Sequence, residues 1–112
     1  MRECIFCKIV KGEIKSEILY RGRDVLAFKD IKPVAKIHLL IIPKKHYLPI
    51  NLLKKNEIKI VSKLISVAQK LAKKLKIDKT GYRLIFNTGK DAGLTIEHLH
   101  LHLIGGQKLP WA

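Results

Sequence analysis

The segment Glu97-His98-Leu99-His100-Leu101-His102-Leu103-Ile104-Gly105-Gly106 is the most informative part of this chain, because histidine and leucine alternate in it. A period of two is that of a β-strand, whose successive side chains point to opposite faces. On such a strand the histidines line one face, while the leucines line the other and anchor it in a core. Same-face neighbours lie about 6.5–7 Å apart, so one imidazole can attack while the others flank it. The glycine pair then allows the chain to turn away.

Three histidines in this arrangement admit three interpretations. Imidazoles titrate near pH 7, so the set can supply a nucleophile, an acid and a hydrogen-bond donor. The pattern His-x-His on a strand also suits zinc, so a three-histidine metal site is an alternative. The third interpretation is a solvent-facing row of histidines without a function, since polar residues commonly alternate outward from a half-buried sheet.

The length of 112 residues predicts a single domain over residues 1–112. The chain is 47% hydrophobic and has no apolar run near the ~20 residues needed to span a bilayer. Its first seven residues lack the long apolar stretch and cleavage site of a secretion signal. We therefore expect a cytoplasmic protein with no membrane partner.

The formal net charge of +14 arises from 23 Lys plus Arg against 9 Asp plus Glu, and it favours anionic partners such as nucleotides. Much of the excess lies between Lys54 and Lys79, where neither arginine nor an aromatic residue occurs. Nucleic-acid-binding segments usually interleave such residues with their lysines. The stretch alone therefore predicts a solvated helix face, and a nucleic-acid partner is disfavoured.

Hydrophobic periodicity predicts an α+β domain with a largely antiparallel sheet. Over residues 51–75 the apolar residues recur in steps of three and four, which indicates one long amphipathic helix. A short helix is expected at 5–11, ending at Gly12. Besides the histidine segment, strands are expected at 18–20, 25–28, 38–42 and 82–87.

Several motifs besides the histidines have a recognisable order and spacing. They are Ile5-Phe6-Cys7-Lys8-Ile9, Leu26-Ala27-Phe28-Lys29-Asp30-Ile31, Ile41-Ile42-Pro43-Lys44-Lys45-His46, Asn87-Thr88-Gly89, the glycine pair and Trp111. With them the chain resembles the histidine-triad (HIT) superfamily of nucleotide hydrolases and transferases, in its Hint branch. The resemblance covers nearly the whole chain. It implies a homodimer in which each subunit has about five antiparallel strands, one long helix and one short helix.

The resemblance also implies a reaction that needs no cofactor. His100 would attack the α-phosphorus of a purine nucleoside phosphoramidate and form a covalent nucleotidyl-histidine, from which water releases a monophosphate such as AMP. The main-chain carbonyl of His98 would orient that ring, with His38 behind it as a relay. His102 would donate a hydrogen bond to the phosphoryl oxygens.

The nucleotide itself would be held by polar and apolar residues that the resemblance assigns. Asn87 would contact the phosphate, Thr95 the leaving group and Asp30 the ribose hydroxyls. The slot for the base would be formed by Ile5, Phe6, Ile9, Phe28, Ile31 and Leu40. Taken singly, Asp30 could begin a turn, Asn87 could cap a loop, and Phe28 and Leu40 could be ordinary core residues.

Two residues depart from the family pattern in the loop before the triad. Leu94 stands where glutamine is usual, and this change would weaken the rate or alter the choice of substrate. Thr95 stands where serine is frequent, so a hydroxyl is retained.

Cys4 and Cys7 are the chain's only cysteines and form a C-x-x-C, which in a reducing compartment indicates metal or redox chemistry. Some bacterial proteins that this chain resembles carry the same segment and bind structural zinc, with further ligands that match His46 and His98. Two partly buried cysteines without a metal are the alternative. A thioredoxin-like role is disfavoured, because no βαβ pattern surrounds the pair.

Two other functions remain open at this point. A dinucleoside polyphosphate hydrolase is the rival within the family, although the glycine pair followed by Trp111 favours the phosphoramidase branch. A nucleotide-binding module with little turnover is the rival from another class, and the basic charge and Leu94 are compatible with it.

Overall fold

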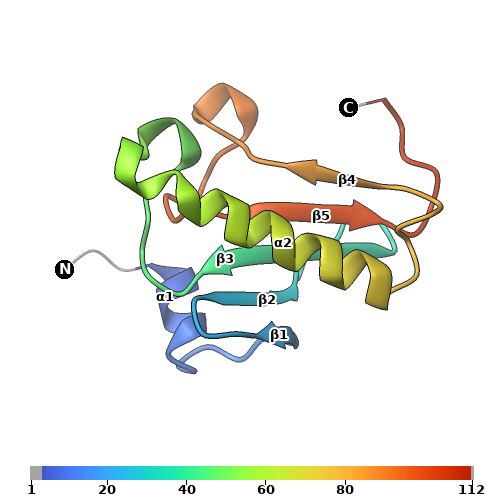
Figure 1. Ribbon diagram of the computed structural model, residues 1–112, viewed down its shortest axis with the longest axis horizontal. Helices are drawn as coiled ribbons and strands as arrows, with labels where there is room; N and C mark the ends of the chain where they lie inside the picture. The colour runs from blue at the N-terminus through green and yellow to red at the C-terminus, as the bar shows by residue number, and fades with distance from the viewer. Residues whose placement is uncertain (1–3, 112) are drawn as a thin grey trace.

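The computed structural model describes residues 4–111 (Figure 1). The helices are α1 (Ile5–Val10) and α2 (Lys59–Lys74), and short 3-10 turns lie at Ile50–Leu52, Lys55–Glu57 and Lys90–Ala92. The strands are β1 (Ile18–Arg21), β2 (Val25–Lys29), β3 (Ile37–Pro43), β4 (Tyr82–Ile85) and β5 (Leu101–Gly105). They form one sheet in the order β1-β2-β3-β5-β4, in which each neighbouring pair is antiparallel. The predicted α+β architecture is confirmed.

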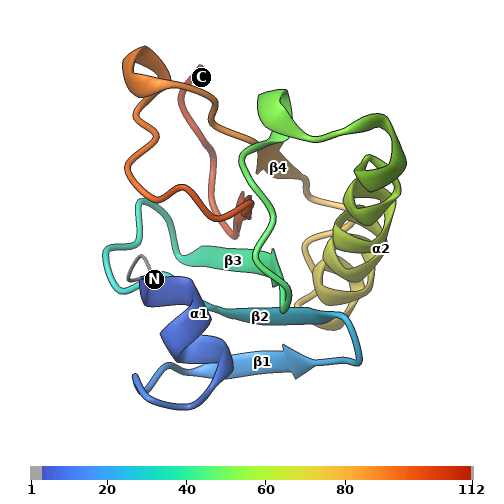
Figure 2. The same ribbon diagram turned by 90° about the vertical axis from the view of Figure 1, so that its left-hand side faces the viewer.

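The two helices cover opposite faces of the sheet, as Figure 2 shows. The larger core lies between α2 and the sheet, and it includes Leu39, Leu64, Leu99, Leu101 and Leu103. A smaller core lies beneath α1 and consists of Phe6, Ile9, Leu26, Phe28, Leu40 and Ile42. The sheet is therefore buried on both faces, which explains why β2 and β3 are almost continuously apolar.

The long helix begins eight residues later than the apolar periodicity predicts. Leu53 and Lys54 adopt extended backbone conformations between the two 3-10 turns, so one helix from residue 51 is not formed. The Glu57 carboxylate accepts a hydrogen bond from the Lys54 main-chain N–H at 2.9 Å, as in the acidic half of a capping box. This contact starts a new turn, which α2 then continues.

The histidine strand also begins later than predicted, at Leu101 rather than His98. The register of β3 on β5 pairs Ile41 with Leu101, so Pro43 would lie opposite Leu99. Proline has no N–H to donate, and it therefore ends the ladder. The Leu99 N–H bonds the Tyr47 carbonyl instead, at 2.8 Å.

The other predicted elements agree with the structure to within two residues. Gly12 follows α1 with a φ of +79°, a conformation that suits glycine. Gly105 ends β5, and Gly106 turns the chain with a φ of +84°. Within the described residues, neither helix is long and apolar enough to cross a membrane.

Candidate active site

The alternation of histidine and leucine sorts the segment onto two faces although its first half is not a strand. Leu99, Leu101 and Leu103 are almost completely buried in the core beneath α2. The histidine rings lie on the other face, where Phe6 of α1 contacts both His98 and His100 edge-on, with ring centroids 5.8 and 5.2 Å apart. The two-faced arrangement predicted from the sequence is therefore present.

His100 has one ring nitrogen fixed and the other free to react. Its Nδ1 lies 2.8 Å from the main-chain oxygen of His98. A carbonyl oxygen only accepts, so Nδ1 carries the proton and Nε2 carries a lone pair. Burial lowers the pKa of His100, against the opposing effect of its hydrogen bond to His98. The neutral ring, with Nε2 as the candidate nucleophilic atom, is therefore the dominant form at pH 7.

The proton position on His102 follows from a chain of contacts that starts at a main-chain amide. The Val34 N–H donates to His38 Nδ1 at 3.1 Å, so the neutral His38 ring carries its proton on Nε2. That Nε2 lies 2.9 Å from Nδ1 of His102 and donates to it. His102 therefore has its own proton on Nε2, available as a donor. Burial lowers the pKa of His102 to about 4, so this ring is neutral near pH 7.

Asp30 lies beside this chain of contacts. One carboxylate oxygen accepts from the Lys32 N–H at 2.8 Å, and the other lies 3.3 Å from Nε2 of His38. Asp30, His38 and His102 thus place three potential metal ligands close together. The Val34 contact argues against a metal here, because a neutral His38 ring already accepting at Nδ1 has no lone pair at Nε2. The cluster instead orients His102.

Sequence reasoning expected His38 behind His100, and the structure places it behind His102. The three triad rings also do not converge on one point, because the His98 ring turns toward the cysteines. Among the described residues, no group of potential metal ligands contains all three triad histidines. The alternative of a three-histidine metal site is therefore wrong.

The residues expected to bind the nucleotide differ in burial, and Asp30 and Asn87 are intermediate. Phe6, Ile9, Phe28 and Leu40 are buried, and the Phe6 and Phe28 rings meet edge-on with centroids 5.6 Å apart. Ile31, by contrast, is 84% exposed, and Ile5 and Thr95 are also exposed. The buried set thus forms a floor beneath the histidine face, and the exposed residues can contact a ligand directly.

The loop before the triad closes around His100 on one side. The Asn87 side-chain amide donates to the Ala92 carbonyl at 2.9 Å. Asn87 and Leu94 line a small space together with Pro49, Ile50, Phe86, His98, Leu99 and His100. Leu94 therefore presents an apolar side chain in the immediate surroundings of the candidate nucleophile.

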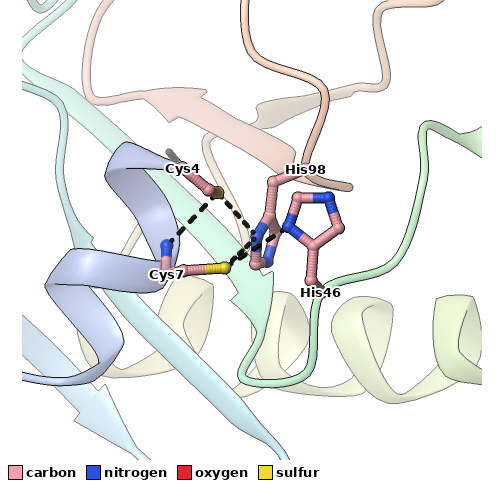
Figure 3. Close-up of side chains that lie close together, drawn as sticks. All are labelled: Cys4, Cys7, His46 and His98. Carbon is pink, nitrogen blue, oxygen red and sulfur yellow. Dashed lines mark hydrogen bonds between the residues drawn. The ribbon is translucent and has the colours of Figure 1, made fainter. Parts of the chain in front are cut away.

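Cys4, Cys7, His46 and His98 form a second cluster at the start of α1 (Figure 3). Their ligand atoms all lie within 4.8 Å of one another. Nδ1 of His98 is 3.4 Å from Cys4 Sγ and 3.6 Å from Cys7 Sγ, and Nδ1 of His46 is 3.3 Å from Cys7 Sγ. Tetrahedral zinc, with Zn–S near 2.3 Å and Zn–N near 2.0–2.1 Å, would set N···S separations of about 3.5 Å.

The protonation of His98 fits this cluster. Its Nε2 donates to the Pro43 carbonyl at 2.9 Å, so the Nδ1 lone pair faces the two sulfurs. Burial lowers the pKa of His98 to about 4, which keeps the ring neutral as metal ligation requires. Burial raises the pKa of the Cys7 thiol, with Cys4 adding to the effect, so this thiol would have to lose its proton when a metal binds. The two sulfur and two nitrogen donors lie at a spacing that would fit a tetrahedral metal ion.

Two main-chain groups that orient these rings were not identified from the sequence. They are the Val34 N–H, which sets the proton on His38, and the Pro43 carbonyl, which sets it on His98. Every residue but proline has an N–H and every residue has a carbonyl, so composition and spacing carry no signal for either group.

Comparisons with known proteins agree with this geometry. A family model described as the HIT domain matches residues 11–109. The purine nucleoside phosphoramidase of Escherichia coli K12 is 41% identical over 107 residues, covering 96% of this chain and 90% of that protein. A histidine triad protein from Clostridium difficile superposes with a TM-score of 0.95 at 46% identity, covering 100% of this chain and 99% of that one. A HIT family hydrolase from Legionella pneumophila gives 0.94 and 41%, with 97% of each chain covered.

Proposed function

This chain belongs to the HIT domain family, and we propose that it hydrolyses purine nucleoside phosphoramidates through a covalent nucleotidyl-histidine. The observation that carries the proposal is the pair of opposite proton positions on neighbouring rings. His100 presents a bare Nε2, and His102 presents a protonated one. A nucleophile and a hydrogen-bond donor thus face the same side of the sheet. The relative named purine nucleoside phosphoramidase supports the choice of substrate class.

In the first step, the Nε2 lone pair of His100 forms a bond to the α-phosphorus. The phosphorus–nitrogen bond breaks, its electron pair goes to the leaving amine, and the amine takes up a proton from the solvent. The ring becomes cationic, and its Nδ1–H keeps its hydrogen bond to the His98 carbonyl, which stabilises that charge. The Nε2–H of His102 donates to a phosphoryl oxygen as negative charge develops there.

In the second step, water attacks the phosphorus and loses a proton to the solvent, and the bond to His100 Nε2 breaks with its electron pair returning to the ring. This releases the nucleoside monophosphate and restores the neutral ring. The remaining assignments position the substrate. Asp30 accepts from the ribose hydroxyls, Asn87 contacts the phosphate and Thr95 contacts the leaving group. The exposed side chains of Ile5 and Ile31 pack against the base above the buried aromatic floor.

The test is AMP release from adenosine 5′-phosphoramidate near pH 7, with rapid-quench mass spectrometry to detect the adduct. Wild type is expected to release AMP and to carry the nucleotidyl group on His100. His100→Gly should abolish release but retain AMP binding, and added imidazole should restore part of the rate, because it can occupy the vacated space. Release by His100→Gly at the wild-type rate would refute the mechanism.

Two outcomes of the same assay would favour the rival functions. Faster release from a dinucleoside polyphosphate than from the phosphoramidate would identify a polyphosphate hydrolase. Binding of AMP with no turnover of either substrate would identify a nucleotide-binding module. Leu94→Gln tests the second case, because it restores the residue usual in the family beside His100 and should then restore turnover.

We also propose that Cys4, Cys7, His46 and His98 hold a structural zinc ion. The support is the donor set, the separations near 3.5 Å and the lone pair that Pro43 directs toward the sulfurs. When bound, zinc cross-links the start of α1 to the loop after β3 and to the triad segment. His98 would use its ring for the metal and its carbonyl for His100, so the nucleophile stays free.

A homodimer and a cytoplasmic location complete the proposal. β4 is an edge strand of the sheet, and all four of its residues are only half-buried in the single chain. Such an edge offers unpaired main-chain groups to a second copy. Light scattering after size exclusion should give twice the mass of 12.8 kDa. A monomeric mass at micromolar concentration would contradict the dimer.

A further inference from the structure

The outward face of α2 is a stripe of cations on the side of the sheet remote from the histidines. Its exposed lysines are Lys59, Lys63, Lys70, Lys73 and Lys74. At 100° per residue these positions fall within about one-third of the helix circumference. The residues of the opposite face are buried, and the 16-residue helix contains no Asp or Glu. We call these five lysines, together with Arg23, the α2 basic face.

The fold adds an arginine and a tyrosine that the lysine-rich segment itself lacks. Arg23 lies in the turn between β1 and β2, and Tyr20 lies at the end of β1. Both line a hollow of about 230 Å³ against α2, together with Lys63, Ser66 and Lys70. Arginine, lysine, serine and tyrosine side chains are the usual donors to phosphate oxygens. The absence of arginine and aromatic residues from the segment therefore no longer argues against a nucleic-acid partner.

One of these cations is already paired. Lys63 Nζ lies 2.9 Å from an Asp24 carboxylate oxygen, and both side chains are about half exposed. This ion pair lowers the pKa of Asp24, and the carboxylate partly offsets the charge of Lys63. Within residues 4–111 no salt bridge is present for Lys59, Lys70, Lys73, Lys74 or Arg23. Five cations thus remain for a polyanion.

We propose that the α2 basic face binds the phosphate backbone of duplex nucleic acid without reading its sequence. The stripe from Lys59 to Lys74 is about 22 Å long at 1.5 Å per residue. One strand of a duplex advances 3.4 Å per nucleotide, so the stripe spans about six phosphates. The face holds no Asn or Gln in line with its lysines, and only one arginine. Charge and length are therefore what it recognises.

The composition of the α2 basic face argues against two other partners, an anionic membrane surface and an acidic protein. Membrane-binding helices insert apolar side chains beside their lysines. The exposed apolar residue of α2, Ile65, lies on the flank of the stripe rather than within it. Protein–protein interfaces are depleted of lysine in their centres, whereas lysine dominates here. A repeating phosphate backbone matches a row of separate point charges.

The test is fluorescence anisotropy with a labelled 20-base-pair DNA duplex of mixed sequence, titrated at several salt concentrations between 50 and 200 mM. Five neutralised phosphates predict a log–log slope near −4.5, which corresponds to a loss of affinity of about 500-fold over this range. The variant Lys59→Gln/Lys70→Gln/Lys73→Gln/Lys74→Gln should bring the slope near −1. Its release of AMP should be unchanged, since the triad lies on the other face.

A matched variant separates the face from the net charge. Lys11→Gln/Lys15→Gln/Lys36→Gln/Lys108→Gln removes the same charge at exposed positions away from α2, and it should keep a slope near −4.5. An equal reduction of the salt slope in both variants would overturn the proposal. Tighter binding of wild type to phosphatidylglycerol vesicles than to the duplex would also overturn it. If the fourfold α2 variant does not fold, the double variant Arg23→Gln/Lys70→Gln should flatten the slope by about 1.8. An unchanged slope in this double variant would overturn the proposal.

Discussion

The substitution His38→Leu tests the proton position that makes His102 a donor. His38 is buried on β3 and donates to His102 Nδ1 at 2.9 Å. Leucine fills a similar volume but has no donor, so the proton of His102 becomes free to move from Nε2 to Nδ1. In that tautomer Nε2 would accept instead of donating, and it would repel a phosphoryl oxygen.

The size of the effect follows from two limits. A neutral hydrogen bond contributes about 1 kcal/mol, so its loss shifts the tautomer ratio by about fivefold. Complete removal of a donor to a developing oxyanion costs about 100- to 1,000-fold in kcat. We therefore expect kcat/KM for adenosine 5′-phosphoramidate to fall by about 5- to 100-fold in His38→Leu. His38→Gln retains an N–H near the position of Nε2 and should recover most of the loss.

Two measurements are made on each variant: the rate of AMP release and the ¹⁵N NMR spectrum of the imidazole nitrogens. The spectrum distinguishes protonated from unprotonated ring nitrogens. Wild type and His38→Gln should show His102 protonated on Nε2, and His38→Leu should show a mixture. A wild-type spectrum with the proton on Nδ1 would refute the reasoning. A fall in activity with an unchanged His102 tautomer would show that His38 acts on the structure in another way.

Three further predictions concern the metal cluster, pH and the core. Elemental analysis should find stoichiometric zinc in wild type but not in Cys7→Ser, and the variant should melt at a lower temperature. Its rate of AMP release at 20 °C should stay within about twofold of the wild-type rate. A loss of turnover without a loss of structure would contradict this prediction. The His102 pKa is lowered from 6.5 to about 4, so the unfolded state binds more protons between these values. Urea unfolding should accordingly show stability falling from pH 6.5 toward pH 4, and less steeply in His102→Asn. Leu101→Ala should cost about 2–5 kcal/mol because Leu101 is fully buried, whereas Ile65→Ala on the exposed flank of α2 should cost under 1 kcal/mol.

The periodicity of the sequence predicted the strands and their faces, but it missed the starts of β5 and α2. Leu99 to Leu103 are buried alternately because the core beneath α2 requires it, and that requirement is visible in the sequence. The start of β5 depends instead on which residue lies opposite Leu99. That residue is Pro43, 56 positions earlier, and no local pattern records the register. The start of α2 depends on Glu57 capping Lys54 after two extended residues.

The candidate site was predictable wherever its chemistry belongs to side chains. The triad, the cysteine pair and His46 carry distinctive residue types, and the structure brings Cys4, Cys7, His46 and His98 together. The partner of His38 was not predictable, because it depends on strand register. Leu40 pairs with His102 and His38 pairs with Ile104, so His38 lies two residues along β3 from the position opposite His102. Without this register, the contact of His38 was assigned to the His100 ring instead of the His102 ring.

His98 shows how one residue can serve both sites without conflict. Its ring is held by the Pro43 carbonyl and directs its lone pair to the sulfurs, while its own carbonyl holds the His100 ring. Pro43 can accept from the ring because the strand ladder has already ended there, for want of a proline N–H. The late start of β5 therefore frees the His98 ring for the cysteine cluster. A residue with an N–H at position 43 would extend the ladder and compete with that orientation.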